Sequence, residues 1–182
     1  ASLRGREVVV KTLQPGACGG GRDGSGSAAT ELLAEICVVA ELNHPRIVTF
    51  VGACLEPKRV ALVTELAHGG NLHQALHVRH RRFSRAECFQ LSTELLEGVL
   101  YLHMQQPTIA HLDIKSMNLV LDAEGQHLQI CDFGLARALC GSGDGVSSPD
   151  PRERPPSRAG SPRYMAPERY DSHLGSIQET GH

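Results

Sequence analysis

The spacing of apolar residues divides this chain into an early part that predicts strands around one helix and a later part dominated by helices. In the early part, β-branched and apolar runs predict strands over residues 6–13, 47–53 and 60–65. Between the first two strands, residues 30–42 have apolar residues at helical spacing and end at an Asn-His-Pro stop. The apolar face of this helix is expected to comprise Leu32, Ile36 and Val39.

The later part begins with a short helix over residues 72–76 and continues with a long helix that ends near residue 103. Ser84 followed by Glu87 is the sequence signature of a capping box, which places the start of the long helix. The apolar stripe of the long helix is expected to comprise Cys88, Leu91, Leu95, Val99 and Leu102.

Segments poor in apolar residues separate some of these elements. Residues 14–29 are rich in Gly, Ser and Ala and predict a loop. Residues 140–162 contain Gly, Ser, Pro and Arg with almost no apolar side chain, so we expect them to be mobile. Two short strands are expected between the long helix and this second segment, over residues 119–121 and 128–131. Because strands come first and helices later, the pattern indicates an α+β fold of two unlike lobes.

Composition narrows the possible functions. The chain has 18 basic and 20 acidic side chains and a net charge of −2, which argues against a nucleic-acid-binding surface. The basic stretch over residues 77–85 lacks interleaved aromatic residues beyond Phe83, so a solvated linker is favoured over a nucleic-acid or lipid site. The six cysteines form no C-x-x-C pair, and no apolar run approaches the ~20 residues of a membrane-spanning helix. We therefore expect a cytoplasmic protein with reduced thiols.

The most informative pattern in the chain is the run His-Leu-Asp-Ile-Lys-Ser-Met-Asn over residues 111–118, followed by Asp-Phe-Gly over residues 132–134. Asp113 is the candidate general base, and Lys115 is the candidate group that neutralises a transferring phosphate. Asn118 and Asp132 offer hard oxygen ligands of the kind that Mg²⁺ prefers. Each residue alone could simply form a turn or a cap, but their joint spacing predicts transfer of a phosphoryl group from ATP to a hydroxyl.

With these motifs, Val-Val-Val-Lys ending at Lys11 and Ala-Pro-Glu ending at Glu168, the chain resembles a protein kinase catalytic domain from about residue 3 to about residue 170. The resemblance is to the serine/threonine kinases of the tyrosine-kinase-like group, which includes Raf and the mixed-lineage kinases. It implies an incomplete two-lobed α+β fold. The implied parts are a partial N-lobe with its hinge over residues 1–67, a partial C-lobe with the catalytic loop and activation segment over residues 68–170, and an unmatched tail over residues 171–182.

The resemblance also implies an ATP site and a catalytic ion pair. In kinases, the lysine at the position of Lys11 holds the α- and β-phosphates and pairs with a glutamate on the following helix. Glu35 fits that role, and Glu31, one turn earlier, is the competing partner. The adenine would meet the backbone of a hinge and two apolar walls, and the implied contacts are Val9, Thr64, Glu65, Ala67 and Val120. The implied cofactors are ATP and Mg²⁺.

On the substrate side, the resemblance implies a docking segment that contains Ser161 and Glu168. Ser161 stands where serine/threonine kinases keep a hydroxyl that bonds the base and the neighbouring lysine. The implied partners are therefore ATP and protein substrates with Ser or Thr acceptors, with no nucleic acid and no membrane segment in this stretch. Cys131 is expected at the back of the ATP pocket, and a stacked apolar spine is implied at Val39, Phe50, His111 and Phe133.

The chain departs from the family pattern in three places. No glycine-rich phosphate loop precedes Lys11, and the helices expected after Glu168 are missing, so we expect a truncated piece with weak or no activity. Leu112 stands where kinases usually have the arginine that binds a phosphorylated loop residue. Two alternatives stay open, a nucleotide-binding pseudokinase or scaffold and an inactive gene-model fragment. The retention of Lys11, Asp113, Asn118 and Asp132 argues against the pseudokinase.

Overall fold

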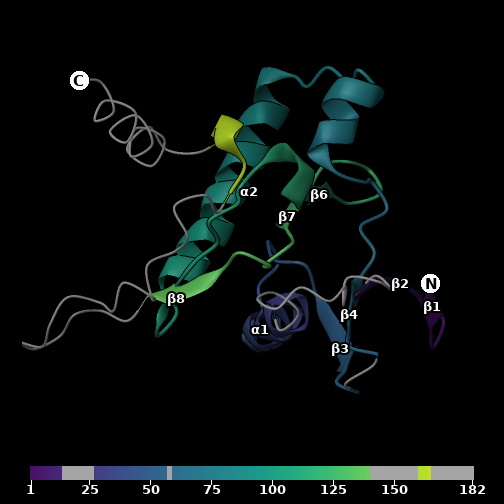
Figure 1. Ribbon diagram of the computed structural model, residues 1–182. Helices are drawn as coiled ribbons and strands as arrows, with labels where there is room; N and C mark the ends of the chain where they lie inside the picture. The colour runs from purple at the N-terminus through teal and green to yellow at the C-terminus, as the bar shows by residue number, and fades with distance from the viewer. Residues whose placement is uncertain (14–26, 57–58, 140–159, 165–182) are drawn as a thin grey trace, which may run out of the picture.

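The computed structural model describes residues 1–13, 27–56, 59–139 and 160–164. Figure 1 shows a small sheet beside helix α1, and a second part of the molecule built along the long helix α2. The expected α+β organisation is thereby confirmed. Most of the two expected loops lie outside the described residues, as do Glu168 and the tail over residues 171–182.

A four-stranded antiparallel sheet forms the first part and has the order β1-β2-β4-β3. Its strands are β1 (Ser2–Leu3), β2 (Arg6–Thr12), β3 (Phe50–Cys54) and β4 (Ala61–Glu65). The β1–β2 hairpin turns at Arg4 and Gly5, whose φ angles are 52° and 81°. Two-residue hairpin turns require this conformation, and glycine adopts it without strain. The register pairs Val9 with Thr64, so these two residues lie side by side on neighbouring strands.

Helix α1 (Ser27–Glu41) packs against β3 and β4. Its sequence consists largely of Ala, Leu and Glu, which are strong helix formers, and it begins a little before the expected residue 30. The expected apolar face is confirmed, because Leu32, Ile36 and Val39 are all buried. A carboxylate is buried on the same face, since Glu35 is only 4% exposed.

The strand expected over residues 47–53 is shorter than predicted, because β3 begins only at Phe50. The two preceding residues are apolar but bond to the second part of the molecule. Ile47 forms an isolated bridge with Ile130, and the Val48 N–H donates to the Ile130 carbonyl at 3.0 Å. A short apolar run cannot show which partner its backbone will choose. Here the choice joins the α1–β3 connection to the strand that leads into Asp132.

Helix α2 (Arg85–His103) begins with the predicted capping box, which is confirmed. The Glu87 N–H donates to Ser84 Oγ at 3.2 Å, and the Ser84 N–H donates to the Glu87 carboxylate at 2.8 Å. The predicted stripe is wrong at Cys88, which is exposed. Strand β7 packs against the helix, where the Leu128 N–H bonds to Glu94, whereas Arg85 and Ala86 in the first turn are exposed like Cys88. The buried positions of α2 are Leu91, Glu94, Gly98 and Leu102.

Short elements complete the second part. The short helix is confirmed as a single π-helical turn, Gln74–Val78. The hairpin of β6 (Leu119–Leu121) and β7 (Leu128–Ile130) is also as expected, whereas the pair of β5 (Thr108–Ala110) and β8 (Arg137–Leu139) was not predicted. One apolar core runs through both parts, and its most buried large members are Val39, Ile47, Leu102, Leu121, Leu128, Ile130 and Phe133. Within the described ranges, no helix has both the length and the apolarity needed to span a membrane.

Candidate functional site

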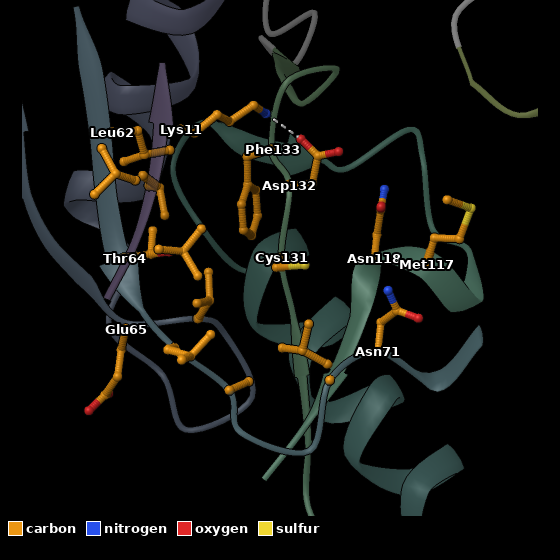
Figure 2. A pocket seen from close by; sticks show the side chains of 18 of the residues that line it. Lys11, Leu62, Thr64, Glu65, Asn71, Met117, Asn118, Cys131, Asp132 and Phe133 are labelled. Atoms are coloured by element: carbon orange, nitrogen blue, oxygen red, sulfur yellow. Dashed lines mark hydrogen bonds and ion pairs between the residues drawn. The ribbon is translucent and has the colours of Figure 1, made fainter. Parts of the chain in front are cut away.

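A cleft of about 550 Å³ opens between the sheet and the second part of the molecule (Figure 2). Strands β2 and β4 supply one wall, β6 and the segment after β7 supply the opposite wall, and residues 65–67 connect the two. The structure brings into this one cleft all the residues that the sequence analysis assigned to ATP or metal binding: Val9, Lys11, Glu35, Thr64, Glu65, Ala67, Asn118, Val120 and Asp132.

Lys11 lies at the centre of an ionic cluster at one end of this cleft. Its Nζ donates to the two oxygens of Glu35 at 3.0 and 2.8 Å and to Asp132 Oδ1 at 2.7 Å. The predicted contact between Lys11 and Glu35 is therefore confirmed, with Glu35 and not Glu31 as the partner. The sequence analysis did not foresee the bond between Lys11 and Asp132, because nothing in the spacing of two distant motifs indicates it.

The three charges of this cluster are unequally buried, and this shapes their pKa values. Burial works to lower the pKa of Lys11, but the bonds and charges of Asp132 and Glu35 outweigh it, and the pKa is raised. Burial raises the pKa of Glu35 more than Lys11 lowers it, and the nearby charge of Asp132 adds to the increase. Lys11 and Asp132 remain 46% and 43% exposed, so two members of the cluster face the open cleft.

Asp113 lies in the loop before β6, and three side chains bond to its carboxylate. Its Oδ2 accepts from Lys115 Nζ at 2.5 Å and from Asn118 Nδ2 at 3.0 Å. Its Oδ1 accepts from the Ser161 N–H at 3.1 Å and from Ser161 Oγ at 3.0 Å. Burial works to raise the pKa of Asp113, but the bonds from Lys115 and Ser161 outweigh it and lower the pKa. Asp113 is therefore a fixed carboxylate that is anionic at neutral pH.

Lys115 completes this second cluster. Its Nζ also lies 3.0 Å from Ser161 Oγ, so one ammonium group contacts both the carboxylate and the hydroxyl. The contact that the sequence analysis expected of Ser161 is present in the structure. Glu168 lies outside the described residues.

His111 links the two clusters. Its Nε2 lies 3.1 Å from the Cys131 carbonyl, and its Nδ1 accepts from the Asp113 N–H at 3.3 Å. Burial lowers the pKa of His111, which agrees with a neutral ring that donates through one nitrogen and accepts through the other. Its ring packs against Phe133 with centroids 5.0 Å apart, as the spine interpretation expected. The bridging role was missed, because a histidine's hydrogen bonds leave no mark in the sequence.

Backbone conformation at the site is unusual at two residues. Leu112 and Asp132 have φ angles of 63° and 65°. Aspartate tolerates this left-handed region, but leucine has no side-chain bond to compensate for the strain. Strained backbone of this kind concentrates at functional sites, where the surrounding structure holds it in place. Here His111 and Asp113 are both anchored by hydrogen bonds on either side of Leu112.

Oxygen donors and one thiol line the floor of the cleft. Asn118 donates its Nδ2 to Asp113, which leaves its amide oxygen available, and Asp132 presents an exposed carboxylate. Together with phosphate oxygens, these groups could hold a hard divalent cation. Cys131 lines the same cleft, in agreement with its expected position. Burial raises the pKa of its thiol to about 12, so it is a poor nucleophile at neutral pH.

Comparison with known proteins places the chain in a family. The family described as "Protein kinase domain" matches residues 2–178. The chain is 35% identical over 170 residues to serine/threonine-protein kinase CTR1 of Arabidopsis thaliana, an overlap that covers 92% of this chain and 19% of that protein. It is 33% identical over 174 residues to mitogen-activated protein kinase kinase kinase 7 of Homo sapiens, which covers 94% of this chain and 25% of that protein.

A probable serine/threonine-protein kinase of Dictyostelium discoideum is 32% identical over 165 residues, which is 91% of this chain and 16% of that protein. The chain thus spans a quarter or less of the length of these relatives. The family match covers nearly all of the chain and includes both clusters described above. The chain belongs to the protein kinase domain family.

Proposed function

We propose that this chain forms the catalytic part of a protein serine/threonine kinase that transfers the γ-phosphate of ATP to a Ser or Thr hydroxyl of a protein substrate. One observation carries the proposal. Lys11, a cation bonded to two carboxylates, lines the cleft, and Asn118, which lines the same cleft, bonds to the separately anchored carboxylate of Asp113. That arrangement provides both a phosphate-binding end and a hydroxyl-binding end.

The adenine of ATP would bind at the strand β4 end of the cleft. The Leu66 N–H donates to the Glu7 carbonyl at 3.2 Å, towards β2. Because backbone groups alternate in direction along an extended chain, those of Glu65 and Ala67 point to the opposite side. Val9 and Val120 line the cleft from opposing walls and would sandwich the ring, with Thr64 beside it.

The phosphates would bind at the Lys11 end. Lys11 has a raised pKa and remains charged, and its bond with Asp132 can be exchanged for a bond with phosphate oxygen because both groups face the open cleft. Asn118 and Asp132 fit a magnesium ion by their oxygen chemistry. A magnesium ion held by these two residues would supply positive charge against that of the phosphates. Glu35 would keep the lysine directed into the cleft.

The acceptor hydroxyl would bind beside Asp113. The Asp113 carboxylate orients the hydroxyl and takes its proton as the new O–P bond forms, while the bond between the γ-phosphorus and the bridging oxygen breaks and ADP leaves. Lys115 would stabilise the charge on the transferred group. Its contact with Ser161 favours Ser and Thr over Tyr as acceptors, in line with the names of the Arabidopsis and Dictyostelium relatives, both described as serine/threonine-protein kinases. We further propose a cytoplasmic location and no nucleic-acid partner, in keeping with the net charge of −2.

The test is phosphate transfer by the complete protein and by its Asp113→Asn variant, with radiolabelled ATP, Mg²⁺ and a generic protein acceptor. We expect transfer to Ser and Thr, reduced by a factor of about 10²–10⁴ in the variant with nucleotide binding retained. A protein that binds ATP but transfers no phosphate would instead support a pseudokinase or scaffold. Transfer that is insensitive to Asp113→Asn would contradict the assigned base.

A further inference from the structure

We propose that Met117 determines which protein sequences this kinase accepts. Its exposed side chain, together with Tyr164, would contact a large apolar residue next to the acceptor Ser or Thr, so that apolar residues are preferred there over basic ones. This inference rests on the proposed kinase function and adds the substrate class to it.

Met117 is unusual in its exposure. It lies in the short turn Ser116–Asn118, in which Ser116 and Asn118 are buried but Met117 is 54% exposed. A large apolar side chain is thus exposed next to the buried asparagine that bonds Asp113, and it lines the cleft. Figure 2 shows Met117 beside Asn118 at the edge of the cleft, away from the wall that carries Leu62 and Thr64.

A second exposed apolar residue lies next to this turn. Ser116 Oγ and Tyr164 Oη are 3.0 Å apart, and Tyr164 is 52% exposed. Tyr164 belongs to the same short segment as Ser161, which bonds Asp113. The carboxylate of Asp113 therefore lies between a turn that presents Met117 and a segment that presents Tyr164.

The reach of an extended peptide places its neighbouring residues on these two side chains. A hydroxyl bound at Asp113 fixes one residue of the acceptor, and each further residue advances about 3.3 Å. The side chain of Asn118, the residue after Met117, bonds to Asp113, with Nδ2 and Oδ2 3.0 Å apart. Residues one or two positions from the acceptor therefore fall within reach of Met117 and Tyr164.

The charges around this part of the cleft disfavour a basic residue. Two carboxylates of this region are already paired, Asp113 with Lys115 and Asp132 with Lys11. Asn71 and Gln74, which line the same cleft, are neutral, and Arg163, next to Tyr164 in the chain, is exposed. A lysine or arginine of the acceptor would therefore meet carboxylates that already have cationic partners, and an exposed positive charge. An apolar residue would instead bury part of the Met117 side chain.

The experiment is a positional peptide library phosphorylated by the complete protein and by two charge variants. Met117→Glu places a carboxylate at the proposed contact. Met104→Glu is the matched control, because Met104 is 71% exposed at the end of α2 and has no contact with the cleft. The KM for ATP is measured in parallel to separate an effect on the nucleotide from an effect on the peptide.

We expect the wild type to select Leu, Met or Phe at one position within two residues of the acceptor. In Met117→Glu, kcat/KM for the selected peptide should fall about tenfold, and the same position should now select Arg or Lys. Met104→Glu should keep the wild-type selection. A wild type with no apolar selection, or the same selection in both variants, would overturn the role of Met117 while leaving the kinase function intact. Absence of any phosphate transfer by the wild type would overturn both.

Discussion

Two buried glutamates, Glu35 on α1 and Glu94 on α2, have nearly the same exposure, but their surroundings shift their pKa values in opposite directions. Glu35 is 4% exposed and Glu94 is 3% exposed. Glu35 bonds to a lysine that it shares with Asp132, and burial raises its pKa. For Glu94, burial also works to raise the pKa, but its hydrogen bonds and the charge of Arg46 outweigh burial and lower the pKa.

The donors around Glu94 come from three separate parts of the chain. Oε1 lies 3.1 Å from Arg46 Nη2, 2.8 Å from His127 Nδ1 and 3.3 Å from Gln90 Nε2, and Oε2 accepts from the Leu128 N–H at 2.7 Å. The Arg46 carbonyl in turn accepts from the Ile130 N–H at 2.8 Å. Glu94 thus fastens α2 to the α1–β3 connection and to β7.

The Lys11 cluster is partly exposed and can exchange a partner, whereas the Glu94 cluster surrounds a buried carboxylate and keeps its partners. The Lys11 cluster opens to the cleft, where a ligand can replace the bond between Lys11 and Asp132. The Glu94 cluster satisfies its carboxylate from within the protein, and a buried polar group held by several donors stiffens its surroundings. Glu94 bonds to the connection that follows α1, the helix of Glu35, and to β7, the strand that leads into Asp132. The closed cluster therefore holds the two segments that carry the carboxylates of the open one.

The largest expected effect concerns activity at the open cluster. In Asp132→Asn, we expect the rate of phosphate transfer to fall by about a thousandfold, because a charged oxygen at the phosphate end is lost. The Tm should change little, since Asp132 is 43% exposed and Lys11 keeps Glu35 as its partner. Transfer assays and thermal unfolding of the complete protein measure the two quantities. A large drop in Tm would show that the open cluster also holds the fold together.

The second prediction concerns stability at the closed cluster. Glu94→Ala removes the buried acceptor of Arg46 Nη2 and of the buried Leu128 N–H, although Arg46 keeps its more exposed partner Glu97. This loss should lower the free energy of unfolding by about 3 kcal/mol. The Tm should fall by roughly 6–12 °C. Glu97→Ala is the matched control, because Glu97 also bonds Arg46 but is 50% exposed, and it should cost at most about 1 kcal/mol. Equal losses of unfolding free energy in the two variants would mean that the burial of Glu94 adds nothing to the stability of its ion pair with Arg46.

The sequence predicted the open cluster far better than the closed one. Lys11, Asp113, Asn118 and Asp132 stand in motifs whose spacing reflects chemistry. The placement of Lys11, Asn118 and Asp132 at one cleft, with Asp113 bonded to Asn118, could therefore be foreseen. The local sequence around Glu94 indicates an ordinary solvent-facing position on a helix. It does not reveal the buried bonds, because their donors come from distant parts of the chain.

Other elements were missed for related physical reasons. Cys88 has the spacing of a buried residue, but it lies in the first turn of α2, where Arg85, Ala86 and Cys88 are all exposed. Ile47 and Val48 have the composition of the following strand but bond to Ile130. Strands β5 and β8 consist of three residues each, and they form because distant segments pair, which local composition does not reveal.

The third prediction uses the opposite pKa directions of the two glutamates. Because the pKa of Glu35 is raised, the native state binds its proton more readily than the unfolded chain, and ionisation of Glu35 at rising pH lowers the free energy of unfolding. Glu94 has a lowered pKa, so its contribution is present above its ordinary value of 4.5 and is lost as pH falls through the native pKa.

Chemical denaturation between about pH 3 and about pH 7 can separate the two contributions. The difference in unfolding free energy between the wild type and Glu94→Gln should shrink as pH falls. For Glu35→Gln, the change with pH should have the opposite sign, with the wild type gaining relative to the variant at low pH. The same sign for both variants would show that the two carboxylates do not differ as described.

The smallest expected effect concerns Leu112, which lies between His111 and Asp113, two residues anchored by hydrogen bonds. In kinases with arginine at this position, that arginine and a loop phosphate form a charge-assisted pair that orders the activation segment. Leucine has no donor, and here the loop is already held, since His111 bonds to Cys131 and Asp113 bonds to Ser161. Phosphatase treatment of the complete protein should therefore change kcat/KM by less than about twofold.

The variant Leu112→Arg makes the test sharper, because it restores the missing donor and should make activity respond to phosphorylation. A large loss of wild-type activity on phosphatase treatment, recovered by rephosphorylation of a loop serine, would show that another basic residue supplies the pairing that Leu112 lacks.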